Sequence, residues 1–328
     1  MHTGGERRDS SGGLAREEVG PSHTVAPLSL PLALPLAKTG LDRAAHYRSN
    51  AAELEALWSK AKIAHFNGEK FLTDESGLIF LPSDHLIDGE RYFLGLDLEQ
   101  QPYFLFHSPT LFGPEESYRL LREANLDELQ IALAVHAQSL ALWHKRHPHC
   151  SVCGKLTSPQ LGGSVRRCPD CETEHYPRTD PAIIVLIRDS RDRILLGRQQ
   201  VWPEHRFSTF AGFVEPGEAF EAAVIREVKE EANVQVHTIE YVGSQPWPFP
   251  ASMMIAFTAV ISDPENAQAD GEEIVDIKWL DRDSIYEELS QEALLLPPPL
   301  SVARAMIEAW YAADGKVRPA LSSAESWR

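Results

Sequence analysis

The 328-residue sequence predicts a mixed α/β (α+β) protein, in which a C-terminal mixed α/β sandwich follows a small cysteine-rich module and an N-terminal α+β domain. Three observations support this fold class. Short apolar runs flank one long amphipathic helical segment in the C-terminal half, all four cysteines lie between Cys150 and Cys171, and a separate set of helical and strand-like patterns precedes them. A chain of this length is also expected to contain two or three structural units.

The composition limits the classes of function. The formal net charge is −17, from 31 basic and 48 acidic residues, which is unfavourable for sequence-independent nucleic-acid binding through Lys and Arg. No stretch reaches the ~18 apolar residues of a membrane span, and the first twenty residues do not resemble a signal peptide. Cysteines confined to one short window indicate a metal site in a reducing compartment rather than a disulfide framework. We therefore expect a cytoplasmic protein that does not associate with membranes.

The N-terminal part of the chain divides into a tail and a small domain. Residues 1–38 are rich in Gly, Ser and Pro without sustained periodicity, which predicts a disordered tail. Residues 39–145 predict a small α+β domain. Its first helix is indicated by apolar residues at helical spacing between Leu54 and Ala61.

Two strands and a second helix complete that domain. The strands are expected at residues 91–98 and 102–107. The helix is expected to begin with Asn125 as its N-cap and Glu128 three residues later, in a capping-box arrangement. His136 lies on the apolar stripe of this helix, and we expect it to be a hydrogen-bonded core residue rather than a ligand.

The C-terminal half predicts the main domain at residues 179–316 and a short tail at residues 317–328. A central helix surrounded by strands indicates sandwich layers. The expected elements are strands at residues 181–187, 194–196, 207–213, 253–261 and 277–280, and a final helix at residues 301–312.

The cysteines form two Cys-x2-Cys pairs fourteen residues apart, Cys150 with Cys153 and Cys168 with Cys171. Each pair can bring two thiolates to one tetrahedral ion, so we expect a zinc ribbon at residues 146–178. Four protein ligands leave no open coordination position, which indicates one structural Zn²⁺. Three nearby arginines leave nucleic-acid or protein binding by the ribbon open: Arg166, Arg167 and Arg178.

A carboxylate-rich helix is expected after the turn at residues 212–218. Glu227, Glu230 and Glu231 are spaced i, i+3 and i+4, so they share one face. The apolar stripe of the same helix is Phe220, Val224 and Val228. Because Glu227 and Glu231 lie beside this stripe, the acids crowd toward the protein body, where divalent cations such as Mg²⁺ or Mn²⁺ would offset their repulsion and desolvation. The alternative is a solvated acidic helix face.

This segment resembles the Nudix box, Gly-x5-Glu-x7-Arg-Glu-U-x-Glu-Glu-x-Gly-U, in which U is apolar. The matching residues are Gly212, Glu218, Arg226, Glu227, Val228, Glu230, Glu231 and Val234. Asn233 replaces the last glycine, and we expect this difference to be mild because Asn tolerates the left-handed conformation that ends a helix. The resemblance implies a Nudix α/β/α sandwich.

A second motif resembles one particular family of Nudix hydrolases. Residues 244–252 read Ser-Gln-Pro-Trp-Pro-Phe-Pro-Ala-Ser, similar to the signature of the NADH pyrophosphatase (NudC-like) family of Nudix hydrolases. That family also carries a four-cysteine ribbon before the Nudix domain, a Tyr-Pro-Arg run like residues 176–178, and a triple proline followed by Val-Ala-Arg like residues 297–304. The resemblance covers roughly residues 39–312.

The second motif suggests a substrate pocket. Trp247 and Phe249 can offer flat apolar surface to a base or a nicotinamide ring, and Gln245 and Ser252 can hydrogen-bond polar edges. A proline-rich connection with aromatics in the core is the alternative. The resemblance further implies dinucleotide contacts, some across a homodimer interface, from Phe213, Tyr176, Met254 and Ala303.

The implied reaction is hydrolysis of the diphosphate of NADH or NAD⁺ to nicotinamide mononucleotide and AMP, and the NAD-capped 5′ end of an RNA presents the same bond. Two or three Mg²⁺ or Mn²⁺ ions are expected at Glu227, Glu230, Glu231, Glu273 and the carbonyl of Ala211. Glu231 is the expected base or water-orienting residue, and Arg226 is expected to orient the glutamates. Two alternatives stay open: a hydrolase of ADP-ribose or another nucleoside-diphosphate-X, and a nucleotide-binding zinc-ribbon interaction module.

Overall fold

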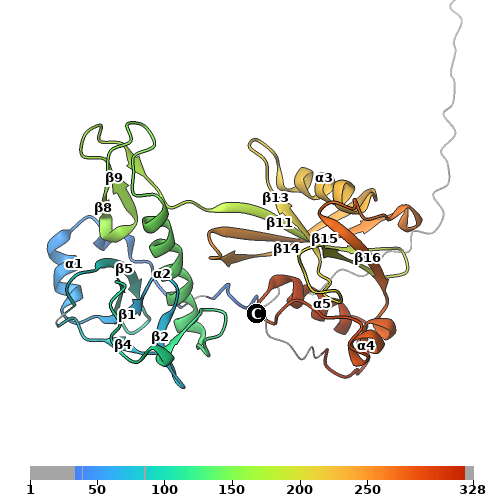
Figure 1. The fold of residues 1–328 in the computed structure, drawn as a ribbon, viewed down its shortest axis with the longest axis horizontal. Coiled ribbons are helices and arrows are strands. Elements are labelled where there is room, and N and C mark those ends of the chain that lie inside the picture. The colour runs from blue at the N-terminus through green and yellow to red at the C-terminus, as the bar shows by residue number, and fades with distance from the viewer. Residues whose placement is uncertain (1–33, 39, 85, 322–328) are drawn as a thin grey trace, which may run out of the picture.

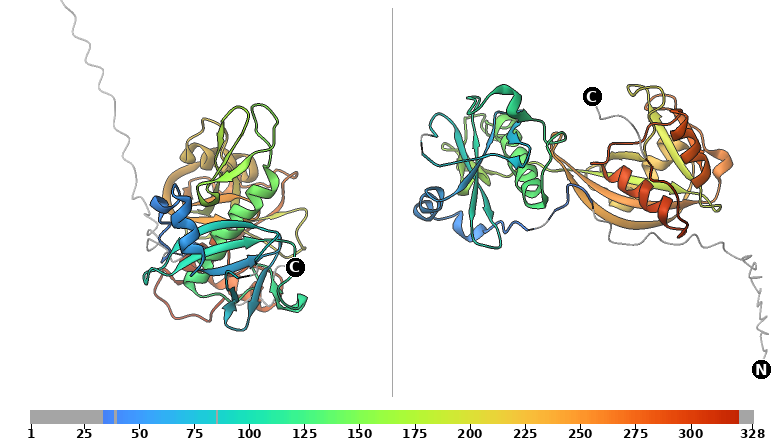
Figure 2. Two further views of the ribbon diagram at one scale, coloured as in Figure 1. Left: turned by 90° about the vertical axis from the view of Figure 1, so that its left-hand side faces the viewer. Right: turned by 90° about the horizontal axis from the view of Figure 1, so that it is seen from below.

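The computed structural model describes residues 34–38, 40–84 and 86–321, which form two lobes (Figure 1). Each lobe is built on its own β-sheet. The cysteine-containing hairpins stand at the edge of the N-terminal lobe, and a narrow waist joins the lobes (Figure 2). This mixed α/β architecture confirms the predicted fold class.

The N-terminal lobe is a seven-stranded sheet between two helices, α1 (Ala51–Trp58) and α2 (Glu128–Arg146). Its strands are β1 (Lys62–Phe66), β2 (Phe71–Asp74), β3 (Gly77–Leu78), β4 (Phe80–Leu81), β5 (Glu90–Leu96), β6 (Pro102–His107) and β7 (Tyr118–Arg119). The order is β3-β2-β1-β6-β5, with β4 paired to β1 and β7 to β2. Both predicted strands correspond to β5 and β6.

Alternation along the strands explains why a helix covers each face. Successive side chains of a strand point to opposite faces. Tyr103 and Leu105 of β6 therefore belong to the cluster under α2, whereas Phe104 and Phe106 pack with Trp58 of α1.

The predicted start of α2 is wrong by two residues. Asp127, not Asn125, is the N-cap, and its carboxylate accepts the backbone N–H of Gln130 at 2.8 Å. Both residue types are good caps, so the choice depends on how the helix packs. His136 is largely enclosed, as expected, but its Nδ1 has no hydrogen-bond partner among the described residues. Burial lowers the pKa of His136 well below its usual value.

The ribbon contains β8 (Ser158–Gln160), β9 (Val165–Arg167) and β10 (Glu174–His175) in the order β10-β9-β8. It is fixed to α2 by Arg166, whose Nη1 lies 2.8 Å from Nδ1 of His144, while Nε2 of His144 lies 2.8 Å from the carbonyl oxygen of Gly163. Arg166 is buried. It therefore serves the packing of the ribbon and is not available to a nucleic acid.

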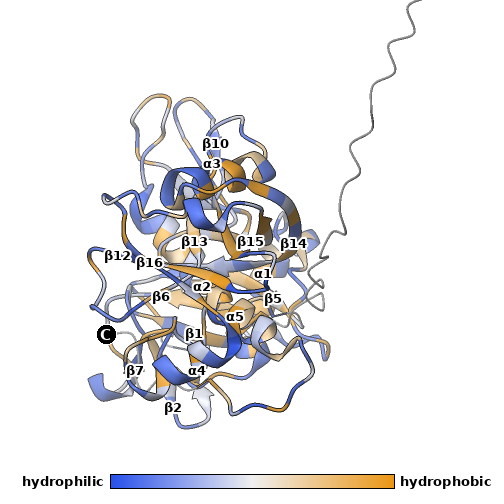
Figure 3. Ribbon diagram, turned by 90° about the vertical axis from the view of Figure 1, so that its right-hand side faces the viewer, coloured by the Kyte–Doolittle hydropathy of each residue, from blue (hydrophilic) through white to orange (hydrophobic). Residues whose placement is uncertain are grey.

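The C-terminal lobe is a six-stranded sheet in the order β14-β15-β11-β12-β16, with β13 paired to β11. Its strands are β11 (Asp180–Arg188), β12 (Ile194–Gln199), β13 (Phe210–Phe213), β14 (Val236–Trp247), β15 (Ser252–Ile261) and β16 (Ile274–Leu280). Its helices are α3 (Phe220–Ala232), α4 (Arg282–Ser290) and α5 (Val302–Ala312). One apolar cluster lies under α3 and another under α4 and α5, so the predicted α/β/α layers are confirmed. In Figure 3 the strands between the helices are mainly hydrophobic and the connecting loops mainly hydrophilic.

Two elements of this lobe are absent from the sequence-based expectation. β14 is a twelve-residue strand that pairs with β15 along its whole length, and its prolines and polar residues hide the strand pattern. α4 begins with a capping box between Asp281 and Ser284, a local signal that could have revealed it. Of the predicted strand at residues 207–213, only residues 210–213 form β13, and residues 207–209 precede it.

The predicted N-terminal tail ends too late. Leu34 is buried in the core of the C-terminal lobe and Leu36 in that of the N-terminal lobe, so residues 34–38 connect the two lobes. Residues 1–33 of that tail and residues 322–328 of the C-terminal tail lie outside the described residues, whereas Leu321 is buried. Across the described ranges, no helix is long and apolar enough to cross a membrane.

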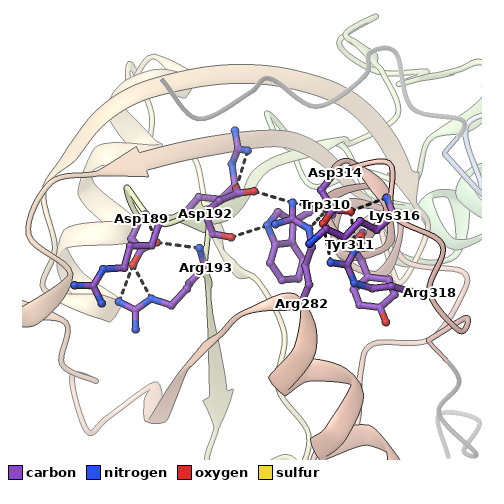
Figure 4. A network of polar contacts seen from close by, with 11 residues as sticks. Asp189, Asp192, Arg193, Arg282, Trp310, Tyr311, Asp314, Lys316 and Arg318 are labelled. Atoms are coloured by element: carbon purple, nitrogen blue, oxygen red, sulfur yellow. Dashed lines mark hydrogen bonds and ion pairs between the residues drawn. The ribbon is translucent and has the colours of Figure 1, made fainter. Parts of the chain in front are cut away.

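A polar network ties the outer helices to the sheet (Figure 4). Arg282 of α4 lies 2.7 Å from Asp192 in the β11–β12 turn and donates to the carbonyl oxygen of Trp310 in α5 at 2.8 Å. Trp310 donates its indole N–H to the carbonyl oxygen of Asp192 at 3.0 Å. These bonds cross-link three elements, which gives the network a structural role.

Candidate active site

A tight turn leads into α3, and a side chain from within the turn closes it by a hydrogen bond to the backbone. The carboxylate of Glu218 accepts the backbone N–H of Glu215 at 2.9 Å. Gly217 has φ +86°, a left-handed conformation that favours glycine. At the other end, Asn233 is the C-cap with φ 56°, so the substitution of the last box glycine is accommodated as predicted.

Of the three glutamates on the acidic face of α3, two are buried and one is exposed to solvent. Glu231 is 3% exposed and Glu227 8% exposed, as expected for acids directed toward the protein body. Glu230 differs, because its side chain is 59% exposed. Phe220 is 41% exposed, so the predicted apolar stripe is wrong at its first position. Ala223 and Ala232, both buried, join Val224 and Val228 instead.

Arg226 holds the glutamates of the box in place. Its guanidinium lies 2.8 Å from a Glu218 carboxylate oxygen, 2.7 Å from Glu227 and 3.1 Å from Glu230. It also donates to the carbonyl oxygen of Phe213 at 3.0 Å. These contacts match the expected orienting role, and they use the whole fork of donors that arginine provides.

Glu231 is the most unusual titratable group of the site. Burial raises its pKa to about 9, and the nearby charges of Glu273, Glu227 and Asp270 act in the same direction, opposed by a hydrogen bond from the backbone of Ala211. Its Oε2 is buried without a hydrogen-bond partner among the described residues. A buried carboxylate oxygen with no donor, surrounded by other carboxylates, suits a hard cation. The residues present therefore fit a divalent metal ion.

Glu273, the expected fourth ligand, lies on the loop before β16. Its Oε1 accepts a hydrogen bond from Nε2 of Gln199 at 3.2 Å. The loop is closed by Asp270, whose carboxylate accepts the backbone N–H groups of Glu272, Glu273 and Ile274 at 3.0, 3.3 and 2.8 Å. Asp270 and Gln199 are thus two residues that sequence analysis missed, and both act on Glu273.

The carboxylates are near one another without forming a closed ligand set. Within the described part of the chain, only the four cysteines bring three or more candidate ligand atoms within 4.8 Å of each other. Glu227 and Glu230 are instead engaged by Arg226. A metal ion would therefore draw carboxylates away from the arginine.

A cavity of about 210 Å³ opens beside Glu231. Its walls come from strands β11 to β16, the end of α3 and the start of α5. Besides Glu231, five predicted site residues line it: Ala211, Gln245, Trp247, Met254 and Ala303. Sequence analysis missed several other lining residues, since nothing local marks them: Trp202, Ser208, Thr209 and Val302.

The remaining predicted contacts lie elsewhere or are differently engaged. Phe213 and Tyr176 are 62% and 66% exposed and do not line the cavity. Ser252 begins β15 outside the cavity lining. Gln245 lines the cavity, but its amide donates to the carbonyl oxygen of Leu300 at 2.9 Å and accepts the N–H of Val302 at 2.8 Å. Gln245 therefore positions the start of α5.

The four cysteines form the second candidate metal site. Cys150 and Cys171 have sulfur atoms 3.6 Å apart, and Cys153 and Cys168 have sulfur atoms 3.4 Å apart. Zn–S bonds of about 2.3 Å in a tetrahedron place sulfurs roughly 3.8 Å apart. All four cysteines are free of disulfides, so the cluster fits the structural Zn²⁺ that the spacing predicts.

Comparison with known proteins matches the domains that carry the two sites. Residues 178–297 match the family model of the NUDIX domain, and residues 145–176 match that of the NADH pyrophosphatase zinc ribbon domain. The chain is 32% identical over 308 residues to the NAD-capped RNA hydrolase NudC of Mycobacterium bovis, covering 87% of this chain and 96% of the relative. The chain belongs to the NADH pyrophosphatase family of Nudix hydrolases.

Other relatives extend this result. The chain is 33% identical over 264 residues to the human NAD-capped RNA hydrolase NUDT12, covering 76% of this chain and 54% of that protein. Among solved structures, a NUDIX hydrolase from Nitrosomonas europaea matches 53% of this chain and 96% of its own, with 18% identity and a TM-score of 0.39. The two family matches and the identity to the mycobacterial relative show a Nudix hydrolase, an enzyme in which a zinc ribbon precedes the box helix.

Proposed function

We propose that this Nudix hydrolase cleaves the diphosphate of NADH and NAD⁺ to nicotinamide mononucleotide and AMP, and that it removes NAD caps from RNA. The observation that carries the proposal is that Glu231 of the box helix and Trp247 of the proline-rich motif line one cavity. The carboxylate supplies a place for the diphosphate chemistry, and the indole supplies a face for a ring of the dinucleotide. The names of the relatives, NAD-capped RNA hydrolases, support the same substrates.

Glu227, Glu230, Glu231 and Glu273, with the carbonyl of Ala211, would hold two or three divalent ions. When bound, Mg²⁺ or Mn²⁺ neutralises the charge of the diphosphate and lowers the pKa of a water molecule. Glu231 is placed to orient the attacking water and accept its proton, because its free Oε2 faces no competing donor. Arg226 holds the carboxylates of Glu227 and Glu218 next to the turn that precedes α3.

Trp247, Met254 and Ala303 would form the walls around one ring of the dinucleotide. Their side chains are apolar, whereas Ser208 and Thr209 add hydroxyl groups to the lining. Oγ1 of Thr209 is buried without a partner in the described part of the chain, so it is available to a polar edge of the substrate. Gln245 would act indirectly by fixing the position of Ala303.

We also propose that the enzyme acts as a homodimer in the cytoplasm. The cavity of about 210 Å³ is below the ~300–1,000 Å³ usual for small-molecule pockets, so it would enclose only part of a dinucleotide. Phe213 and Tyr176 are exposed apolar residues outside it. A second copy could bring such residues over the remainder of the substrate, and light scattering of the purified protein tests the stoichiometry. The free cysteines support a reducing compartment.

The test is hydrolysis of NADH by the purified, zinc-loaded protein with Mg²⁺ or Mn²⁺, followed by chromatography of the products. The wild type should release AMP and the reduced mononucleotide, and Glu231→Gln should lose turnover by several hundredfold or more. No turnover of NADH, NAD⁺ or capped RNA by folded protein would contradict the proposal and favour a binding module.

A parallel variant separates this reaction from ADP-ribose hydrolysis. Trp247→Ala should sharply reduce turnover of NADH, because the indole wall of the cavity is lost. Faster hydrolysis of ADP-ribose than of NADH by the wild type, with NADH turnover unaffected by Trp247→Ala, would instead assign the cavity to ADP-ribose.

A further inference from the structure

A second hollow of about 340 Å³ lies where the N-terminal lobe meets the turn after β14. The turn contributes Pro248, Phe249 and Pro250, and α2 contributes Gln138, Leu142 and Arg146. Nε2 of Gln138 donates to the carbonyl oxygen of Pro248 at 2.7 Å in a buried contact. The hollow is therefore a fixed feature at the junction of the two lobes.

The hollow and the catalytic cavity share one aromatic pair. Trp247 lines the cavity beside Glu231, whereas Phe249 lines the hollow. The two rings meet edge to face, with centroids 4.9 Å apart. A substrate that extends past the indole would thus arrive directly at the phenyl ring of Phe249.

The wall of the hollow carries unpaired positive charge. Arg122 and Arg146 both line it, and neither forms an ion pair or a side-chain hydrogen bond with any residue in the described ranges. Lys145 is also near, because its Nζ would lie 3.6 Å from a Cβ built on Gly68, another lining residue. Glu69 is the one carboxylate in the lining. In a protein with net charge −17, such a group of free cations indicates an anionic ligand.

Guanidinium groups beside a half-buried aromatic ring are the chemistry that recognises a nucleotide: arginine binds phosphate through its fork of donors, and a base stacks on apolar faces. We propose that this hollow binds the first nucleotide of the RNA chain that follows an NAD cap. Arg122 and Arg146 hold its phosphate, and its base lies against Phe249 and Pro250. The assignment rests on the proposed decapping function and specifies where the RNA body is held.

This site explains how so acidic a protein can bind RNA. The contact is confined to a few phosphates next to the cap, so the negative charge elsewhere does not have to be overcome along a long strand. It also predicts that NADH, which has no further nucleotide, makes no use of Arg122 and Arg146.

The test compares Arg122→Ala/Arg146→Ala with the wild type on NADH and on an NAD-capped single-stranded RNA of about ten nucleotides. The kcat/KM for NADH should stay within about twofold. For capped RNA, kcat/KM should fall about tenfold through KM, and the slope of its logarithm against log salt should become shallower by ~0.7, because one phosphate is no longer neutralised. Arg191→Ala/Lys316→Ala is the control, since it removes two positive charges at exposed positions without a side-chain ion pair in the described ranges.

Equal losses on both substrates, or equal losses of capped-RNA turnover in the double variant and the control, would overturn the assignment. A binding measurement separates it from the proposed reaction: fluorescence anisotropy of a 5′-monophosphorylated ten-nucleotide RNA with Glu231→Gln needs no turnover. The added Arg122→Ala/Arg146→Ala changes should weaken this binding about tenfold. AMP that displaces the RNA as well as an unlabelled RNA of the same sequence does would assign the hollow to a free nucleotide and reject the RNA site.

Discussion

Gly212 offers a direct test of how the box helix is positioned. A Cβ at this residue would lie 1.9 Å from both Cδ and Oε1 of Glu227 and 2.3 Å from Oε2. Non-bonded heavy atoms rest at about 3.5–4.0 Å. Gly212→Ala must therefore displace the carboxylate of Glu227 by roughly 1.5 Å. The absence of a side chain at Gly212 is what allows Glu227 to lie against β13.

The same change should cost little stability. Gly212 does not adopt the left-handed conformation found at other glycines of the described chain, and the group that must move is the end of a flexible side chain. We expect the free energy of unfolding to change by less than ~1 kcal/mol, or a few degrees in Tm. A misplacement of ~1 Å in a catalytic array costs on the order of 100-fold. The kcat/KM for NADH should fall by about this factor.

The assay is steady-state NADH hydrolysis at saturating Mg²⁺, paired with thermal unfolding of the same samples. Gly217→Ala provides the converse control. Its φ of +86° strains any other residue, but nothing lies within 4 Å of the added Cβ. It should lose roughly 1–2 kcal/mol of stability and retain most of its kcat. A Gly212→Ala protein with activity within threefold of the wild type would refute the reasoning.

Four further outcomes are expected. Asp270→Ala should raise the Mg²⁺ concentration for half-maximal activity about tenfold at unchanged Tm, because the loop that carries Glu273 loses the hydrogen bonds from its backbone N–H groups to Asp270. An unchanged Mg²⁺ requirement would argue against this positioning role of Asp270. Gln138→Leu should lower the free energy of unfolding by ~1–3 kcal/mol in urea titrations, since the buried carbonyl of Pro248 loses its donor; an unchanged midpoint would show that water replaces the amide. Removal of zinc by a chelator should lower Tm and release one equivalent of metal per chain, measured with a colorimetric indicator; a metal-free protein with the same Tm would contradict a structural zinc. A hydrogen bond with His107 lowers the pKa of Glu90 to about 2. The ionised Glu90 therefore stabilises the fold above the ordinary carboxyl pKa, and this stabilisation is lost as the pH falls toward 2. Glu90→Gln should reduce the fall in the free energy of unfolding over this acidic range, and an unchanged dependence on pH would exclude the contribution.

Features that depend on a few neighbouring residues could be read from the sequence. The two cysteine pairs predict the tetrahedral cluster, since the turns of each pair fix both thiolates locally. The spacing of Glu227 and Glu231 predicts their common buried face on α3. Asn233 predicts the left-handed end of that helix. In each case the helix or turn geometry alone sets the relative positions of the groups.

Tertiary structure decided what lies against these local units. The choice of Asp127 over Asn125 as the cap of α2, the burial of Leu34 and Leu36, and the engagement of Gln245 by residues 300–302 all depend on partners far along the chain. The cavity beside Glu231 combines residues of six strands, which pair out of sequence order, and of the helices α3 and α5. Spacing cannot predict such contacts, because they follow from sheet order and lobe packing. The sequence thus determined which residues are candidate metal ligands, whereas the fold determined which residues line the cavity beside them.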